Sequence, residues 1–138
     1  MIHIIYVSRA IHSMTEEELR FLLHQSRKRN KRQNITGLLL YVGNNFIQLL
    51  EGERRDVEDV YDSILKDNRN SGNIILLNEP IQERDFPNWS MGFQPIDKSV
   101  KNWPDSLSDF LEREYTPAQL AQSPTVIQLL YHFKEIHT

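Results

Sequence analysis

A single glutamine lies inside an apolar, strand-like stretch of the chain, where its amide can both donate and accept hydrogen bonds. Gln48 follows Phe46 and Ile47 and precedes Leu49 and Leu50. A buried amide without partners costs about 1–3 kcal/mol, so Gln48 must find hydrogen bonds. Glutamine offers both an acceptor and two N–H donors. It can therefore join a donating group to an accepting group and exchange those roles by turning. The alternative is a core amide that is satisfied by backbone groups.

An alternating stretch near the N-terminus supplies a possible partner for this amide. Side chains alternate between the two faces of a strand, so Ile4, Tyr6 and Ser8 share one face. If this face and that of Gln48 meet the same helices, the Tyr6 phenol and the Gln48 amide lie within hydrogen-bond reach. A tyrosine at such a position can also be a packing residue. The pair predicts a polar site between the sheet and its helices.

Two more polar residues stand at the predicted ends of helices. Asn30 lies within a basic run at the end of the first helix, and Asp67 ends the second. Basic residues at a helix C-terminus are favoured by the helix dipole, which explains the run without a nucleic acid. Asn30 is then either a C-cap or an amide aimed at a planar ligand between the helices. Asp67 is either solvated or the matching polar group on the other side.

The elements that must position these residues alternate in type along the chain. Thr15 and Glu18 form a capping box, and Gly43 and Asn44 provide a hairpin turn. The order β-α-β-β-α-β-β is typical of an α+β, ferredoxin-like sheet with both helices on one face and the first and third strands adjacent. Strands are predicted at residues 2–8, 35–42, 46–50, 73–77 and 89–93, and helices at residues 15–29 and 57–65.

The pattern changes after Pro95, which divides the chain into two predicted parts. Residues 1–96 form the sheet domain, and residues 97–138 a C-terminal extension. Pro117 and Pro124 break this extension into short helices, which carry an apolar face. We expect the extension to form a helical cap on the second face of the sheet or a partner-binding surface.

Composition excludes several functional classes. The chain has 138 residues, a formal net charge of −3 and no cysteine. It therefore has neither a disulfide framework nor a thiolate metal site, and no overall basic field attracts nucleic acid or anionic membranes. The N-terminus does not have the pattern of a signal peptide, and no apolar run reaches the length of a membrane span. We expect a cytoplasmic protein without a metal centre.

Taken in order, the polar residues and the motifs around them resemble those of the BLUF family, the flavin-binding sensors of blue light. The resemblance covers residues 1–96. Its motifs are Tyr6 with Ser8, Asn30 ahead of Ile35-Thr36-Gly37-Leu38-Leu39, Gln48 ahead of Leu50-Glu51-Gly52-Glu53, and Trp89-Ser90-Met91.

The resemblance implies a non-covalent FAD between the two helices, although the residues themselves do not separate FAD from FMN or riboflavin. It implies that Tyr6 gives an electron and then a proton to the excited flavin, and that the Gln48 hydrogen bonds rearrange. It also implies that Asn30 holds the carbonyl and imide edge of the ring, with Asp67 near its pyrimidine side. The lit state of such proteins has a red-shifted spectrum and reverts in the dark.

For signal output, the resemblance implies that Ser8, Trp89 and Met91 relay the change, with either Trp89 or Met91 facing the flavin. Arg29, beside Asn30, occupies a position that varies in the family. We expect no enzymatic domain in a chain of this length. Signalling would then use a separate, unidentified protein or self-association into a homo-oligomer.

Two other functional classes remain as alternatives. A ferredoxin-like module that binds RNA or a regulatory ligand would use the basic run, and RNA binding predicts exposed aromatic residues on the middle strands. A small enzyme such as an acyl phosphatase could use Glu51 and Glu53. Their neighbours supply no nucleophile or general base, so we expect both carboxylates to be solvated.

Overall fold

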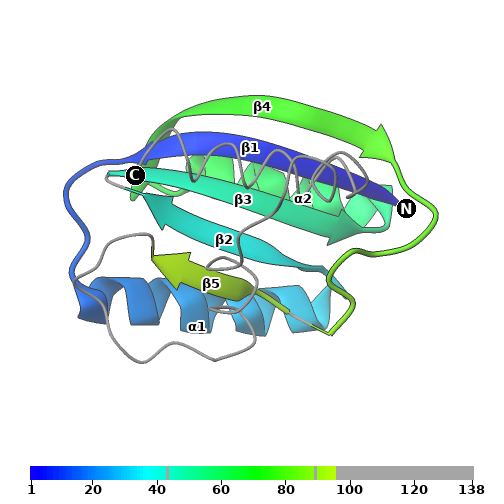
Figure 1. Ribbon diagram of the computed structural model, residues 1–138, viewed down its shortest axis with the longest axis horizontal. Coiled ribbons are helices and arrows are strands. Elements are labelled where there is room, and N and C mark those ends of the chain that lie inside the picture. Colours follow the sequence, from blue (N-terminus) through cyan, green and yellow to red (C-terminus); the bar gives the residue numbers. More distant parts are fainter. Residues whose placement is uncertain (43, 89, 96–138) are drawn as a thin grey trace, which may run out of the picture.

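The computed structural model describes residues 1–42, 44–88 and 90–95. They form a five-stranded sheet with two helices, in the strand order β4-β1-β3-β2-β5 (Figure 1). The first and third strands are adjacent, and the predicted ferredoxin-like α+β fold is confirmed. The predicted C-terminal helical cap of residues 97–138 lies outside the described residues. The elements are β1 (Ile2–Ala10), α1 (Glu16–Arg32), β2 (Thr36–Val42), β3 (Asn45–Gly52), α2 (Arg54–Lys66), β4 (Asn70–Pro80) and β5 (Gly92–Pro95).

The two central strands place their alternating residues in register. β1 and β3 are antiparallel, and Ile4 pairs with Leu50, Tyr6 with Gln48 and Ser8 with Phe46. In Figure 1, α2 runs behind β1 and β3, and α1 runs along the β5 side of the sheet. Residues of both helices join one face of the sheet in a single apolar core. The core residues are Ile2, Ile4, Tyr6, Ala10, Met14, Leu19, Leu23, Ile35, Leu39, Tyr41, Phe46, Leu50, Val57, Val60, Ile64 and Met91.

Helix α1 begins as predicted and ends later than predicted. The Thr15 hydroxyl accepts the Glu18 N–H at 3.1 Å, and the Glu18 carboxylate accepts the Thr15 N–H at 3.1 Å, which completes the capping box. The helix continues past the expected end at residue 29 to Arg32. Asn30 is therefore a fully buried residue within the helix, and the interpretation of Asn30 as a C-cap is wrong. Basic residues in the last turn stabilise this longer helix.

The outer strands also differ from the prediction. β4 covers Asn70–Pro80 instead of residues 73–77, because pairing with β1 along its length overrides the poor strand preference of its ends. β5 begins at Gly92, later than expected, and runs parallel to β2. Met91 therefore precedes the strand, so the alternation of side chains along β5 does not fix its direction. Within the described ranges, no helix is both long enough and apolar enough to cross a membrane.

Candidate functional site

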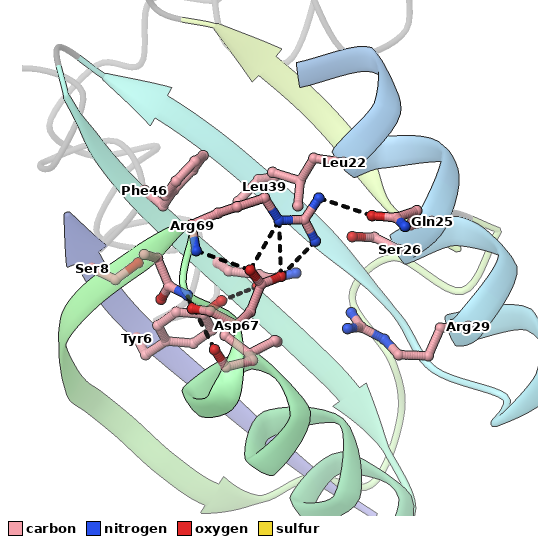
Figure 2. A pocket seen from close by; sticks show the side chains of 13 residues that line it. Tyr6, Ser8, Leu22, Gln25, Ser26, Arg29, Leu39, Phe46, Asp67 and Arg69 are labelled. Atoms are coloured by element: carbon pink, nitrogen blue, oxygen red, sulfur yellow. Dashed lines mark hydrogen bonds and ion pairs between the residues drawn. The ribbon is translucent and has the colours of Figure 1, made fainter. Parts of the chain in front are cut away.

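A cavity lies between α1, the C-terminal end of α2 and the helix-facing side of the central strands (Figure 2). Its cavity volume is about 60 Å³, and it opens to solvent. Apolar walls with a few convergent polar groups are typical of cofactor sites. The lining residues are Tyr6, Ser8, Leu22, Gln25, Ser26, Arg29, Leu39, Phe46, Gln48, Ile64, Asp67, Arg69 and Asn70.

Tyr6 and Gln48 meet at the floor of this cavity, as the sequence predicts. Both side chains are buried, and the Tyr6 hydroxyl donates a hydrogen bond to Gln48 Oε1. Burial raises the pKa of the Tyr6 phenol far above its usual value, while the positive charge of Arg29 opposes this shift. The phenol is therefore protonated at any ordinary pH, and its proton points at the amide oxygen.

Gln48 uses the other end of its amide to contact the segment that precedes β5. Its Nε2 donates to the Met91 sulfur at 3.5 Å, and Met91 is 1% exposed. Met91 therefore lies against the amide, whereas Trp89 falls outside the described residues. Asn30 does not line the cavity; its Nδ2 donates to the Ser90 carbonyl at 2.7 Å. Asn30 thus holds the segment that carries Met91.

Asp67 points into the cavity beside an arginine that the sequence does not single out (Figure 2). Arg69 Nε donates to both carboxylate oxygens of Asp67, at 2.9 and 3.1 Å. This hydrogen bonding lowers the pKa of Asp67, so the carboxylate is charged. Arg69 also donates to the Gln25 amide oxygen of α1 at 2.8 Å, which links the two sides of the cavity.

Two polar atoms at the cavity are buried without a protein partner among the described residues. These atoms are Ser8 Oγ and Arg29 Nη2. Figure 2 shows Arg29 pointing from α1 into the cavity. Burial lowers the pKa of Arg29, because a charged group loses its hydration there. Buried polar groups in folded proteins are nearly always hydrogen-bonded, so these two atoms are available to bond a polar ligand or water in the cavity.

The cavity includes lining residues that sequence analysis missed. Gln25, Ser26, Arg69 and Asn70 were not predicted. Leu22, Ser26 and Arg29 share a face of α1 because residues three and four apart are neighbours on a helix. That spacing was available in the sequence. The place of Arg69 depends on how the chain leaves α2, and no local pattern predicts it.

The structure removes the support for one alternative function and overturns one expectation from the sequence. Tyr6 is 3% exposed and Phe46 is 4% exposed, so neither offers a stacking surface to RNA. The expectation that Glu51 is solvated is wrong, because its side chain is fully buried and accepts backbone N–H groups. Glu53 is exposed, as expected.

A comparison with known families agrees with this geometry. The family profile described as "BLUF: Sensors of blue-light using FAD" matches residues 1–92. The chain belongs to the BLUF family. Members of this family sense blue light with a bound FAD, and this chain contains that sensor domain. The apolar side chains that line the cavity are chemically compatible with an aromatic ring, and the unpartnered Ser8 Oγ and Arg29 Nη2 atoms are compatible with the polar edge of a flavin.

Similar proteins include a BLUF protein whose chain is of similar length and much longer cyclases. The "Photoactivated adenylate cyclase subunit beta-like protein FB" of Euglena gracilis is 30% identical over 124 residues, which cover 89% of this chain and 14% of that protein. The dark-state structure of BlrB, a BLUF protein, is 25% identical with a TM-score of 0.69, and 96% of each chain is covered. A bacterial light-regulated adenylyl cyclase is 29% identical with a TM-score of 0.71 over 99% of this chain and 35% of that one. The chain thus spans a small part of the curated relatives that it matches.

Proposed function

We propose that Tyr6 is the electron and proton donor of this blue-light sensor and that Gln48 is its hydrogen-bond switch. The observation that carries the proposal is the buried hydrogen bond from the Tyr6 hydroxyl to Gln48 Oε1. When bound, FAD absorbs blue light and accepts an electron.

Tyr6 is suited to give up an electron and then a proton. Its phenol is neutral in this site, because burial raises its pKa. Loss of an electron makes a phenolic proton strongly acidic, and the hydrogen bond to Gln48 supplies a path for that proton. A neutral donor whose proton has a fixed acceptor avoids leaving an isolated charge in a buried site.

Gln48 is suited to switch because its two ends have different partners. Oε1 accepts from Tyr6, and Nε2 donates to Met91. When the phenol no longer donates, Gln48 Oε1 loses its hydrogen bond. Rotation of the amide, or a change of its tautomer, pairs its donors and acceptors again. The apolar walls of the site strengthen such bonds and exclude competing water.

The remaining polar residues hold the flavin and pass the change outward. Arg29, Ser8 and Asp67 would bind the polar edge of the ring. Asn30 would support the ring indirectly, through its hydrogen bond to the Ser90 carbonyl. Met91 would relay the turning of Gln48 to β5, since a signal requires contacts that differ between the two states. Ser8 and Trp89 are the further relay residues of this proposal.

The output of this domain is not itself enzymatic in our proposal. Residues 1–96 would act as the sensor, and residues 97–138, a downstream signalling protein or a second copy of the chain would receive the change. BlrB, which the chain matches along nearly its whole length, supports a sensor of this size. The cyclases that it matches in part support coupling to a larger assembly. We place the protein in the cytoplasm.

Absorption spectroscopy of the purified protein tests the proposal directly. We expect a yellow protein with bound FAD whose visible spectrum shifts to the red under blue light and returns in the dark. A colourless protein, or a flavin spectrum that blue light leaves unchanged, would refute it. Binding of RNA with a steep dependence on salt would instead favour the RNA-binding alternative.

A further inference from the structure

Glu51 is a buried carboxylate on the opposite side of the sheet from the cavity. It follows Leu50, which faces the helices, so its side chain points to the other face. It is fully buried. Its two oxygens accept the backbone N–H groups of Asp85, at 2.6 Å, and of Phe86, at 3.0 Å. These bonds attach the loop that contains Asp85 and Phe86 to β3.

Arg84 attaches the same loop to the sheet from the neighbouring position. Its Nη1 donates to Thr36 Oγ1 at 2.9 Å and to the Glu51 carbonyl at 3.0 Å, and its Nη2 donates to the Asn34 carbonyl at 2.7 Å. The loop is therefore tied to the start of β2 and to the end of β3. A loop with this many specific bonds has a defined position.

The other end of this loop lies at the switch. Asn30 holds the Ser90 carbonyl, and Arg27 Nε donates to the Met91 carbonyl at 2.9 Å. The Met91 sulfur then lies 3.5 Å from Gln48 Nε2. Glu51 and Gln48 belong to the same strand and point to opposite faces. The loop thus connects a buried carboxylate on one face to the amide on the other.

We propose that Glu51 is a positioning residue for the light response: by fixing Asp85 and Phe86, it determines how firmly Met91 is held against Gln48. The Gln48 amide must displace the Met91 sulfur when it turns, so a fixed loop raises the barrier between the two amide orientations. A loosened loop lowers that barrier, and the lit state decays faster. This inference rests on the proposed role of Gln48.

Three variants separate positioning from simple stabilisation. Glu51→Ala removes both acceptors, and Glu51→Gln keeps the shape and one good acceptor. Leu49→Ala is the matched control. Leu49 is fully buried on the same face of β3 as Glu51, and it is next to Gln48 in the sequence. If general loosening of the strand changed the light response, Leu49→Ala would change it as well.

The experiment combines hydrogen exchange with decay of the lit state. In flavin-free protein, we expect Glu51→Ala to speed exchange of the Asp85 and Phe86 amides at least tenfold, with a smaller effect in Glu51→Gln. In flavin-loaded protein, we expect at least threefold faster dark recovery in Glu51→Ala, an intermediate rate in Glu51→Gln, and a wild-type rate in Leu49→Ala. Arg84→Met provides a second loosened loop if Glu51→Ala does not fold, and we expect the same direction of change.

Each outcome decides the proposal. Faster amide exchange with an unchanged recovery rate would overturn the positioning role, and the reversible shift would still support the proposed function. Equal acceleration in Leu49→Ala would also overturn it, because destabilisation alone would then explain the effect. A wild-type protein without a reversible shift would refute the proposed function, and this inference with it.

Discussion

Tyr6 and Gln48 are directly opposite each other on antiparallel strands, and the phenol donates to the amide oxygen in the core of the domain. Opposite residues in such a pair have Cβ atoms about 4.5–5.5 Å apart, which brings their side chains together on one face. The two strands are central in the sheet. The distance between donor and switch is therefore fixed by the backbone.

Replacement of Tyr6 by Phe should leave FAD bound and abolish the reversible spectral shift. The ring and its packing remain, but the hydroxyl that donates to Gln48 is lost. Absorption spectra before and after blue illumination measure the effect. Tyr61→Phe is the control, since the Tyr61 ring packs edge-on against Tyr6 with centroids 5.2 Å apart, and we expect its shift to be retained. A normal photocycle in Tyr6→Phe would remove Tyr6 from the donor role.

Replacement of Gln48 by Leu should also keep the cofactor and lose the shift, because the side chain no longer has an amide to turn. The Tyr6 hydroxyl loses its acceptor, and we expect the free energy of unfolding to fall by about 1–3 kcal/mol. Gln25→Leu is the matched control, because Gln25 lines the same cavity and bonds to Arg69 instead of Tyr6. Spectra and urea denaturation of both variants give the two readouts; a wild-type lit spectrum in Gln48→Leu would contradict the switching role.

The sequence predicts the centre of this site better than its surroundings. Tyr6 and Gln48 lie on central strands whose apolar alternation fixes the face of each side chain. Their meeting therefore followed from strand parity and the order of elements. The capping box at Thr15 fixed the start of α1 for a similarly local reason.

The parts that were predicted incorrectly depend on contacts between distant segments. Asn30 resembles a C-cap in sequence, but the carbonyl of Ser90, 60 residues later, satisfies its amide within the helix. Glu51 was predicted to be solvated, because no local pattern reveals that Asp85 and Phe86 return to bind it. Long-range partners of this kind allow a buried carboxylate that composition alone disfavours.

Replacement of Arg29 by Met should weaken FAD binding about tenfold, which corresponds to roughly 1.4 kcal/mol. Arg29 Nη2 is buried and has no protein partner among the described residues, so a ligand atom at the cavity is its natural acceptor. Methionine keeps most of the apolar length of the side chain. Lys28→Met removes a charge from the adjacent, exposed position and should not change the affinity. Flavin titration of the apoproteins measures the dissociation constant of FAD for each variant. Equal affinities for the two variants would exclude Arg29 from the site.

Replacement of Gly37 by Ala should prevent stable folding. A Cβ at this position would lie 1.9 Å from the carbonyl oxygen of Leu49, and a backbone atom of a central strand cannot move away. Gly72→Ala is the control: Gly72 has a φ of +64° with nothing within 4 Å of the added atom, so only backbone strain of about 1–2 kcal/mol is expected. Expression and thermal unfolding compare the two variants. A Gly37→Ala protein as stable as Gly72→Ala would contradict the close approach of these strands.

The buried Glu51 carboxyl should make stability depend on pH near neutrality. Burial raises its pKa to about 7, and the N–H groups of Asp85 and Phe86 and the charge of Arg84 only partly oppose this shift. At a pH between the ordinary pKa of a glutamate and about 7, the folded protein binds a proton at Glu51 that the unfolded chain does not. The free energy of unfolding therefore decreases as pH rises through this interval, by at most about 1.4 kcal/mol per pH unit. Above about pH 7, the stability contributed by this bound proton has been lost.

Comparison with Glu51→Gln isolates this effect from the other titrating groups around it. Burial also raises the pKa of Asp85, and the charge of His3 opposes that shift, but both groups are present in both proteins. We expect the stability of wild type relative to Glu51→Gln to fall between pH 5 and pH 8 and to remain level above pH 8. Urea denaturation across this range measures the difference. A difference that stays constant with pH would show that Glu51 does not hold its proton in the folded state.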